Sequence, residues 1–378
     1  MPFSSLGLSP ALLKVLAEQN FTAPTPIQQA AIPAILNQKD VLGIAKTGSG
    51  KTAGYVLPIL TNLQQTVIVK NRHVKVLVVV PTRELAIQVI EVFQLFSQAL
   101  PQTIKCMAVF GGVSINPQMM ALQGVNVLVA TPGRLLELVE ANAVHLSGID
   151  TLVLDEADKM LNLGFKEEMD KIIALLPVKR QNLLFSATLS KDIKLINQLL
   201  LQDPEVIQIA EEPGTFDTIT QVAYKVTDDK KGPLLRYLIK QHDMKQVLVF
   251  ASSVYQADAI VNKLGKNNID ARAIHSKKSQ GARTEAMRLF KSNKLRVLVA
   301  TDLLSRGIDI DFLPYVINYD LPRSPKDYIH RIGRTGRAEA TGEAISLISP
   351  EEEHHFSVIQ KKMGKQVEMI DSQSLKVV

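Results

Sequence analysis

A glycine-rich segment near the N-terminus has the residue types of a phosphate-binding loop. Residues 45–52 read AKTGSGKT and follow a short apolar run, 41–44, that predicts a β-strand. A glycine-rich turn leading into a helix presents backbone N–H groups to phosphate oxygens, while Lys51 can reach the β- and γ-phosphates and the Thr52 hydroxyl can hold Mg²⁺. The strict phosphate-loop pattern requires glycine where this chain has Ala45, so a plain glycine-rich turn stays open as the alternative.

Two adjacent carboxylates could supply the second half of an ATP site. Asp155 and Glu156 follow the apolar run 152–154. A strand-end aspartate can hold Mg²⁺ opposite Thr52, and a neighbouring carboxylate can orient or deprotonate an attacking water. Acidic pairs are common on protein surfaces, so a solvated turn is the alternative for this pair taken alone. Together with the loop, it predicts an ATP site in which Lys51 and Glu156 are catalytic.

Three arginines recur at a spacing of three in HRIGRTGR, residues 330–337. On a helix, Arg331, Arg334 and Arg337 would lie on one face. Three guanidinium groups on one face repel one another unless an anion lies opposite. The segment therefore predicts a surface that faces an anion, and a structural cluster of ion pairs is the alternative.

The elements that must position these residues are short strands alternating with helices, which is typical of parallel sheets flanked by helices. The β-rich runs are 74–81, 125–131, 151–158, 182–188, 246–253, 271–276, 296–301 and 315–322. Each ends in a polar or small residue, at the sheet edge where open α/β sheets bind ligands.

Two strand sequences repeat across the halves of the chain. VLVAT occurs at 127–131 and at 297–301, an offset of 170, and VLVVVPT at 76 aligns with VLVFASS at 247, an offset of 171. Two matches in one order favour two similarly built domains in tandem. We expect an N-terminal domain over 1–210, a polar linker over 211–219 and a C-terminal domain over 220–378, with a last helix over 351–365.

Composition narrows the class of protein. The 378 residues are 46% hydrophobic and 21% charged, which excludes a disordered or collagen-like chain. No apolar run exceeds five residues, whereas a membrane-spanning helix needs about 20. The opening MPFSSLGLSP is no secretory signal, the single Cys106 fits a reducing cytoplasm, and the scattered histidines support no zinc site. Basic minus acidic residues give 17 − 16 = +1 over 1–210 and 26 − 21 = +5 over 211–378, so the second half carries the positive field.

Residues 155–158 spell DEAD, and with the other motifs in order the chain resembles the DEAD-box ATP-dependent RNA helicases along essentially its whole length. The resemblance implies two tandem RecA-like domains, each a parallel sheet flanked by helices. In that family AKTGSGKT is the normal loop, so Ala45 is no departure. The implied phosphate contacts are Thr47, Gly48, Ser49, Gly50, Lys51 and Thr52.

The resemblance also implies how the base, ribose and γ-phosphate are recognised. FTAPTPIQ, 21–28, resembles the adenine-reading motif, in which Phe21 and Gln28 read the base and Phe3 is the upstream aromatic. A glutamine offers an acceptor and donors together, although a buried capping glutamine is the alternative. Asp309 matches the ribose contact. Arg334 and Arg337 match arginine fingers, which contribute about 10³ to 10⁵ in rate in other phosphoryl-transfer systems.

Other motif matches imply contacts with RNA and coupling between the domains. The implied RNA contacts are Thr82, Arg83, Gly112, Thr131, Gly133, Arg134, Phe250, Gln280, Arg283 and Thr301. The residues implied to couple hydrolysis to unwinding are Asp158, Ser186, Thr188, Arg306 and His330. Hydroxyl, N–H and guanidinium groups suit phosphates more than base edges. Few aromatics lie among them, which favours backbone contacts with little sequence preference, while the basic stretch 277–296 could be an ordinary solvated face.

The activity that the resemblance implies is unwinding of RNA duplexes or remodelling of RNA–protein complexes, driven by ATP and Mg²⁺ and stimulated by RNA. A non-catalytic, ATP-gated RNA clamp and a DNA helicase or translocase are the alternatives. MLNLGF at 160–165 and SQGART at 279–284 most resemble bacterial RhlE-type members. We expect a cytoplasmic monomer without a membrane anchor, directed to its substrates by protein partners.

Overall fold

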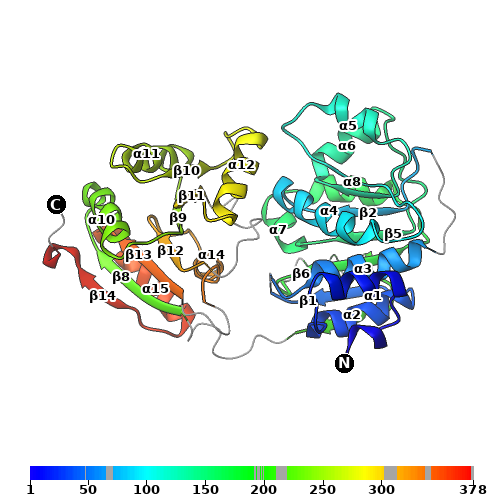
Figure 1. Ribbon diagram of the computed structural model, residues 1–378, viewed down its shortest axis with the longest axis horizontal. Coiled ribbons are helices and arrows are strands. Elements are labelled where there is room, and N and C mark those ends of the chain that lie inside the picture. The colour runs from blue at the N-terminus through cyan, green and yellow to red at the C-terminus, as the bar shows by residue number, and fades with distance from the viewer. Residues whose placement is uncertain are drawn as a thin grey trace. The chain divides into compact units, whose positions relative to one another are not determined.

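The computed structural model divides into two compact units, Met1–Glu211 and Glu212–Val378, here called the N-terminal and C-terminal lobes (Figure 1). The structure describes residues 1–46, 48–64, 71–190, 193, 196, 198, 200–209, 219–301, 313–336 and 342–375. Of the expected linker, only Ile219 is described, and it is the first residue of a strand. Within these ranges, none of the helices has both the length and the apolarity that crossing a membrane requires.

The N-terminal lobe is a parallel sheet in the order β3-β4-β2-β5-β6-β1-β7. Its strands are β1 (Val41–Ile44), β2 (Val76–Val79), β3 (Cys106–Val109), β4 (Val127–Ala130), β5 (Thr151–Leu154), β6 (Gln181–Ser186) and β7 (Glu205–Gln208). Its helices are α1 (Pro10–Glu18), α2 (Pro26–Leu36), α3 (Lys51–Leu63), α4 (Arg83–Ser97), α5 (Ile115–Ala121), α6 (Pro132–Glu140), α7 (Ala157–Asn162) and α8 (Lys166–Ala174).

Alternate side chains of each central strand enter two different cores. Val76 and Val78 of β2 pack with α1 to α4 on one face, whereas Leu77 and Val79 pack with α6 to α8 on the other. Both faces are therefore covered, which explains why the strands read as continuous apolar runs rather than as alternating ones.

The C-terminal lobe is a second parallel sheet, in the order β10-β11-β9-β12-β13-β8-β14. Its strands are β8 (Ile219–Lys225), β9 (Val247–Ala251), β10 (Ala271–Ile274), β11 (Val297–Thr301), β12 (Tyr315–Asn318), β13 (Gly342–Ile348) and β14 (Glu368–Asp371). Its helices are α10 (Asp228–Gln241), α11 (Val254–Gly265), α12 (Gln280–Lys291), α14 (Pro325–Ile332) and α15 (Glu353–Met363).

The two sheets have the same topology. Replacing β1 to β7 by β8 to β14, in chain order, converts the first strand order into the second. The repeated words fall on equivalent strands, VLVAT on β4 and β11 and VLV on β2 and β9. The predicted fold class, two tandem parallel sheets flanked by helices, is confirmed, as are all eight predicted β-rich runs. The predicted last helix is α15, but β14 follows it.

Hydrogen bonds from N-cap side chains hold several of the loops that lead from a strand into a helix. The N-cap residues Thr82, Ser253, Ser279 and Ser324 each accept a hydrogen bond from a backbone N–H in the first turn of α4, α11, α12 and α14. Such caps satisfy amide groups that have no partner inside the helix. Each strand-to-helix connection is therefore held at a defined residue, close to the edge where the predicted site residues lie.

A buried lysine joins three parts of the C-terminal lobe. The Lys231 amino group lies 2.7 Å from a Glu352 oxygen, 3.2 Å from an Asp228 oxygen and 3.8 Å from an Asp320 oxygen, and its side chain is 3% exposed. Glu352 also accepts hydrogen bonds from the backbone N–H groups of Leu321 and Ser349. The network thus links α10 to the segments that follow β12 and β13.

We predict that Lys231→Met destabilises this lobe by about 3–5 kcal/mol, because removing one partner from a buried ion pair leaves the other charges uncompensated. Urea unfolding, together with hydrogen exchange at the amides of β12 and β13, measures the effect. The matched control is Lys245→Met, since the Lys245–Asp243 pair is 76% and 68% exposed. We expect the control to cost at most about 1 kcal/mol. Equal losses in the two variants would contradict the prediction.

Candidate active site

The glycine-rich loop lies between β1 and α3 and makes a close contact with α2. Gly48 and Gly50 have φ angles of +77° and +89°, in the left-handed region that favours glycine. A Cβ atom on Gly50 would lie 2.5 Å from Gln28 Nε2, so a larger residue would have to displace the Gln28 amide. The Ser49 hydroxyl is buried, and no residue in the described part of the chain forms a hydrogen bond with it. The predicted contact Thr47 lies outside the described residues.

Lys51 is held by the carbonyl groups of its own loop. Its amino group donates to the carbonyl oxygens of Ala45 and Lys46, at 2.6 and 2.8 Å, and the residue is 7% exposed. Burial lowers the pKa of Lys51, and the nearby charges of Asp155 and Glu156 oppose that shift. The cation at the start of α3 therefore lies in the same charge cluster as the two carboxylates after β5.

Tyr55, one turn into α3, connects the loop to Asp155. The Tyr55 hydroxyl donates to Asp155 Oδ2 at 2.9 Å. Burial raises the pKa of Asp155, and the charge of Lys51 opposes this effect. Thr52 lies three residues before Tyr55 in α3, so the Tyr55 contact links the first turn of this helix to Asp155. A hydroxyl and a carboxylate are hard oxygen donors, which fit Mg²⁺.

Glu156 has a strained backbone and a single charged partner. Its φ is +54°, in the left-handed region, where non-glycine residues are uncommon and mark functional sites. One carboxylate oxygen lies 2.5 Å from Lys159 Nζ, and the other is buried with no hydrogen-bond partner among the described residues. Burial raises the pKa of Glu156, and the charge of Lys159 opposes that rise. Sequence reasoning missed Lys159, which directly follows the DEAD residues and lies one helical turn after Glu156.

The Gln28 amide caps α2 and also contacts the loop. Its oxygen accepts from the Thr25 backbone N–H at 2.9 Å, and its Nε2 donates to the Gly50 carbonyl at 3.0 Å. The capping geometry left open by the sequence is therefore present, and it links α2 to the loop.

The two predicted aromatic contacts differ in exposure. The Phe21 ring is 38% exposed, and its centroid lies 6.0 Å from that of Phe96. Phe3 is 5% exposed within the N-terminal hydrophobic core. The exposed face of Phe21 is thus open to a ligand, whereas Phe3 packs beneath the surface.

A pair of side chains ties the DEAD segment to the residues that end β6. The Thr188 hydroxyl donates to Asp158 Oδ2 at 2.9 Å, and the Ser186 hydroxyl donates to the Thr188 carbonyl at 2.9 Å. Asp158 is 5% exposed and also accepts from the Lys159 backbone N–H. Three of the predicted coupling residues are therefore joined directly in the N-terminal lobe.

Three of the predicted RNA-contact segments follow β2, β3 and β4, which are neighbours in the parallel sheet, so the segments leave the sheet at the same edge. Gly112 has a φ of +73°, and a Cβ there would lie 2.1 Å from Arg83 Nη2, so this guanidinium packs against the glycine. Arg134 donates to the Val113 carbonyl at 2.8 Å and is 6% exposed. Thr82 caps α4, and Thr131 and Gly133 lie at the start of α6.

In the C-terminal lobe the predicted RNA contacts differ in exposure. Arg283 donates to Gln280 Oε1 across the first turn of α12, and Thr301 ends β11. Phe250 is fully buried, and its ring lies beneath the Arg331 guanidinium, 4.8 Å from the ring centroid to Cζ. The side chain of Phe250 therefore supports Arg331 and does not face solvent.

The expectation that three arginines share one helix face is wrong. Helix α14 ends at Ile332, and the following turn is closed by the Thr335 hydroxyl, which donates to the Leu313 carbonyl. Arg331 is 2% exposed and donates to Asn318 Oδ1 at 3.0 Å and to the Asp320 carbonyl at 2.6 Å.

The other arginines of the motif lie elsewhere. Arg334 follows the helix and is 7% exposed, and His330 lies in the last turn of α14, partly buried. The predicted residues Arg306, Asp309 and Arg337 lie outside the described residues.

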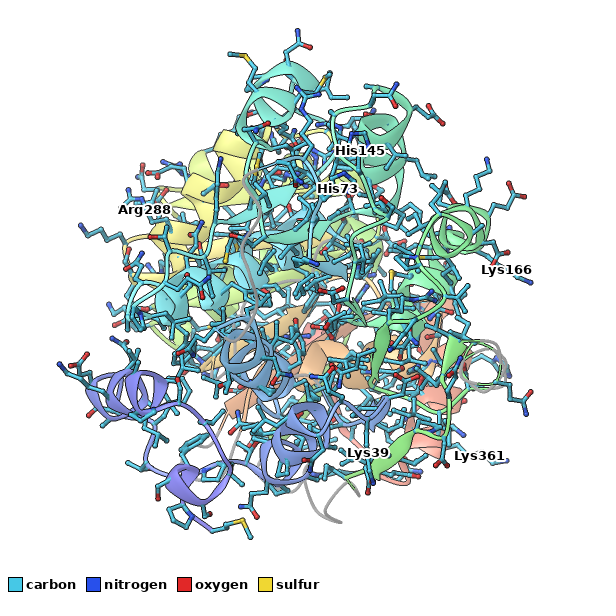
Figure 2. The ribbon with its side chains drawn as sticks, turned by 90° about the vertical axis from the view of Figure 1, so that its right-hand side faces the viewer. Lys39, His73, His145, Lys166, Arg288 and Lys361 are labelled. Carbon is cyan, nitrogen blue, oxygen red and sulfur yellow. The ribbon has the colours of Figure 1, made fainter. Side chains whose placement is uncertain are left out.

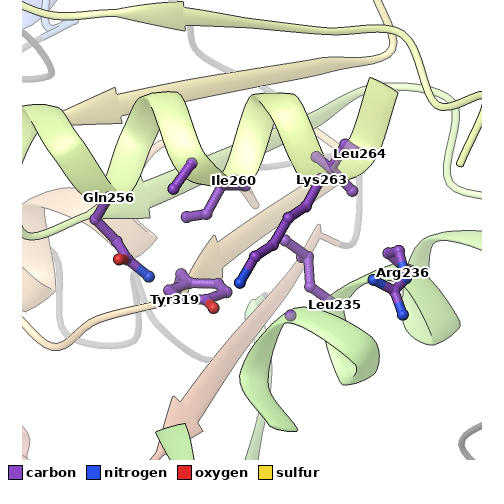
Figure 3. Close-up of a pocket in the computed structure, with 9 residues that line it drawn as sticks. Leu235, Arg236, Gln256, Ile260, Lys263, Leu264 and Tyr319 are labelled. Carbon is purple, nitrogen blue, oxygen red and sulfur yellow. The ribbon is translucent and has the colours of Figure 1, made fainter. Parts of the chain in front are cut away.

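Two further features lie apart from these residues. His73 and His145 form an isolated parallel bridge before β2 and β5, with ring centroids 5.0 Å apart (Figure 2). They were expected to be scattered, because residues far apart in sequence give no sign of meeting. A small pocket between α10 and α11 is lined by Leu235, Ile260 and Tyr319 among others, and none of the predicted site residues lines it (Figure 3).

A glycine-rich loop after β1 and paired carboxylates after β5, on a sheet repeated in a second lobe, define a nucleotide-binding ATPase of two RecA-like domains. The family model "DEAD/DEAH box helicase" matches residues 25–196, and "Helicase conserved C-terminal domain" matches residues 230–339. The chain belongs to the DEAD-box ATP-dependent RNA helicases.

Individual relatives agree with this family. The chain is 40% identical to the ATP-dependent RNA helicase CshA of Limosilactobacillus reuteri over 96% of this chain and 72% of that one. It is 39% identical to the DEAD-box ATP-dependent RNA helicase RhpA of Helicobacter pylori over 98% and 74% of the two chains. The structure of Saccharomyces cerevisiae Dbp5 bound to RNA and ADP BeF3 is similar with a TM-score of 0.85, at 28% identity and 99% and 96% coverage.

We predict that Gln28→Glu weakens ATP binding about 5- to 100-fold, because a carboxylate accepts from Thr25 but leaves the Gly50 carbonyl facing a second acceptor. Competition against a fluorescent nucleotide measures the dissociation constant. The matched control is Gln29→Glu, the same change one residue later, where the amide donates to the Pro24 carbonyl and not to the loop. If the two variants bind ATP alike, the link between Gln28 and the loop has no role in nucleotide binding.

Proposed function

We propose that the chain couples ATP hydrolysis to local unwinding of RNA duplexes or to remodelling of RNA–protein complexes. Residues 1–210 and 220–378 act as the two domains, and 211–219 is the linker that lets them close. The observation that carries this proposal is the contact between Asp158 and Thr188, because it connects the carboxylates of the ATP site to a second loop of the same lobe.

The charged residues of the N-terminal lobe would bind and activate the nucleotide. The Lys51 amino group exchanges its loop carbonyls for phosphate oxygens, and the amides of Gly48 to Gly50 bind the phosphates at the start of α3. Thr52 and Asp155 would hold Mg²⁺, which neutralises developing charge on the phosphates when bound. Glu156 orients the attacking water, and Phe21 and Gln28 bind the adenine.

The C-terminal lobe would complete the site when the lobes close. Arg334 and Arg337 act as arginine fingers on the γ-phosphate, and Asp309 binds the ribose. RNA that contacts both lobes favours the closed state, so by linkage it raises the rate of ATP hydrolysis. Asp158, Ser186, Thr188, Arg306 and His330 transmit closure between the ATP and RNA sites.

The cellular setting follows from the same proposal. We infer a monomer that acts in the cytoplasm, binds the RNA backbone with little sequence preference and relies on protein partners for targeting. The resemblance to bacterial RhlE-type members stays a prediction. The bacterial relatives described above are CshA and RhpA proteins.

We predict that Glu156→Gln keeps binding of ATP and RNA but lowers turnover by about 10² to 10⁴, the range that general acid–base catalysis contributes. Steady-state phosphate release with saturating RNA, together with separate binding titrations, tests this outcome. The control is Glu167→Gln, the same isosteric change at an exposed position of α8. Normal turnover in the Glu156 variant would refute its role and favour another base.

We also predict that RNA stimulates ATP hydrolysis more than DNA of the same sequence does, because an RNA enzyme uses contacts to the 2′-hydroxyl. Phosphate release is measured over a series of concentrations of each nucleic acid, at one salt concentration. Equal stimulation by both would favour a DNA helicase or translocase. Binding of ATP and RNA without any turnover would favour a non-catalytic clamp.

A further inference from the structure

Tyr255 is an exposed aromatic side chain that the sequence motifs do not include. Among the aromatic side chains in the described ranges, only Phe21 and Tyr255 are largely open to solvent, at 38% and 80%. A single exposed apolar side chain is normal on a protein surface. Exposure alone therefore does not identify a ligand for Tyr255, but its position in the lobe does.

Tyr255 lies at the sheet edge that carries the predicted RNA contacts of the C-terminal lobe. It is the second residue of α11, which is capped by Ser253 directly after β9. Strand β9 pairs with β11, which ends at Thr301. The carboxyl ends of parallel strands lie at one edge of the sheet, so the first turn of α11 and Thr301 share that edge.

The contacts of Asp258, one turn after Tyr255, show what this face of α11 packs against. The Asp258 carboxylate lies 3.1 Å from His275 Nε2 and 2.8 Å from Lys278 Nζ, both in the segment between β10 and α12. Tyr255 precedes Asp258 by three residues, so the two side chains are neighbours on the helix surface. The same segment continues into Gln280, the first residue of α12.

The neighbouring residue, Gln256, lies about 100° further round the helix and faces α10. It lines the small pocket between α10 and α11, together with Tyr319 and Lys263 (Figure 3). The first turn of α11 therefore separates that pocket from the segment that holds Lys277 and Lys278. Tyr255 lies one turn before Asp258, whose carboxylate contacts Lys278, so its side of the helix adjoins the segment between β10 and α12.

We propose that Tyr255 is an RNA-binding residue, whose ring stacks on a base of the single strand held along the segment from His275 to Arg283. This inference rests on the proposed function, because it deepens how the RNA site works. Backbone contacts at Gln280 and Arg283 place the strand, and an aromatic ring beside them adds affinity without reading sequence, since every base has a π-face. Phe250 cannot serve this purpose because it is fully buried.

The absence of tryptophan from the chain gives a direct test. Tyr255→Trp creates a single fluorophore, and we expect its emission to be quenched when single-stranded RNA is added with a non-hydrolysable ATP analogue. The matched control is Val178→Trp, at a position in the N-terminal lobe that is 88% exposed. RNA binding without quenching at position 255, or equal quenching in both variants, would overturn the proposal.

Affinity separates stacking from a merely structural role. We expect Tyr255→Ala to weaken RNA binding about tenfold, within the range measured for base–aromatic stacking, and Tyr255→Phe to bind like the wild type. With an abasic oligonucleotide, which keeps the backbone, the wild type and Tyr255→Ala should bind alike. Equal loss on normal and abasic RNA would assign Tyr255 to the backbone site and overturn stacking.

The outcomes also distinguish this inference from the proposed function. If the wild-type chain shows neither RNA binding nor RNA-stimulated hydrolysis, the proposed function fails, whatever the variants do. If both are normal and Tyr255→Ala leaves RNA affinity unchanged, only the stacking role fails. Capture of a protein partner by Tyr255, with RNA affinity unchanged, would assign this surface to protein binding and overturn the inference.

Discussion

Four charges buried beside the ends of β1 and β5 balance one another, and the chemistry of the N-terminal lobe depends on that balance. Lys51 and Lys159 face Asp155 and Glu156, and all four residues are at least nine-tenths buried. Burying an unpaired charge is costly, so each needs a partner inside the protein. The loop carbonyls that hold Lys51 are acceptors that phosphate oxygens of a polyanionic ligand can replace, whereas Glu156 keeps its cationic partner Lys159. The buried charges of this lobe therefore have partners even when no nucleotide is bound.

The repeated sheet explains why two different sites arise from one architecture. Equivalent strands present different residues at their carboxyl ends: β5 is followed by Asp155 and Glu156, whereas its counterpart β12 is followed by Tyr319 and Asp320. In the first case the carboxylates face an amino group of the glycine-rich loop. In the second, the Asp320 carboxylate lies near the Lys231 amino group and accepts a hydrogen bond from the backbone N–H of Ser252. One fold thus holds a buried charge cluster beside the glycine-rich loop in one lobe and, at the equivalent position, a structural network in the other.

The sequence predicted the fold class, because the central strands are buried on both faces and read as apolar runs. It did not predict β3, β8 and β13, nor β7 and β14 at the sheet edges, whose residues are largely exposed and carry no such run. It placed the loop and DEAD residues by motif, but not the partners that hold them. Tyr55 occupies an ordinary helical position, and only the packing of α3 against the sheet brings it to Asp155. Lys159 meets Glu156 locally, as an i,i+3 pair at the start of α7.

The arginine motif shows why spacing alone could not assign roles. A spacing of three suggests three equivalent residues, but the helix ends at Ile332, before the second arginine. Arg331 is then enclosed, with its guanidinium over Phe250 and bonded to the Asp320 carbonyl. Because the Asp320 carboxylate also accepts from Ser252 and lies near Lys231, one aspartate joins the turn after β9 to α14. The first arginine of the motif is thereby a structural residue, and it fixes where the chain leaves α14 toward Arg334.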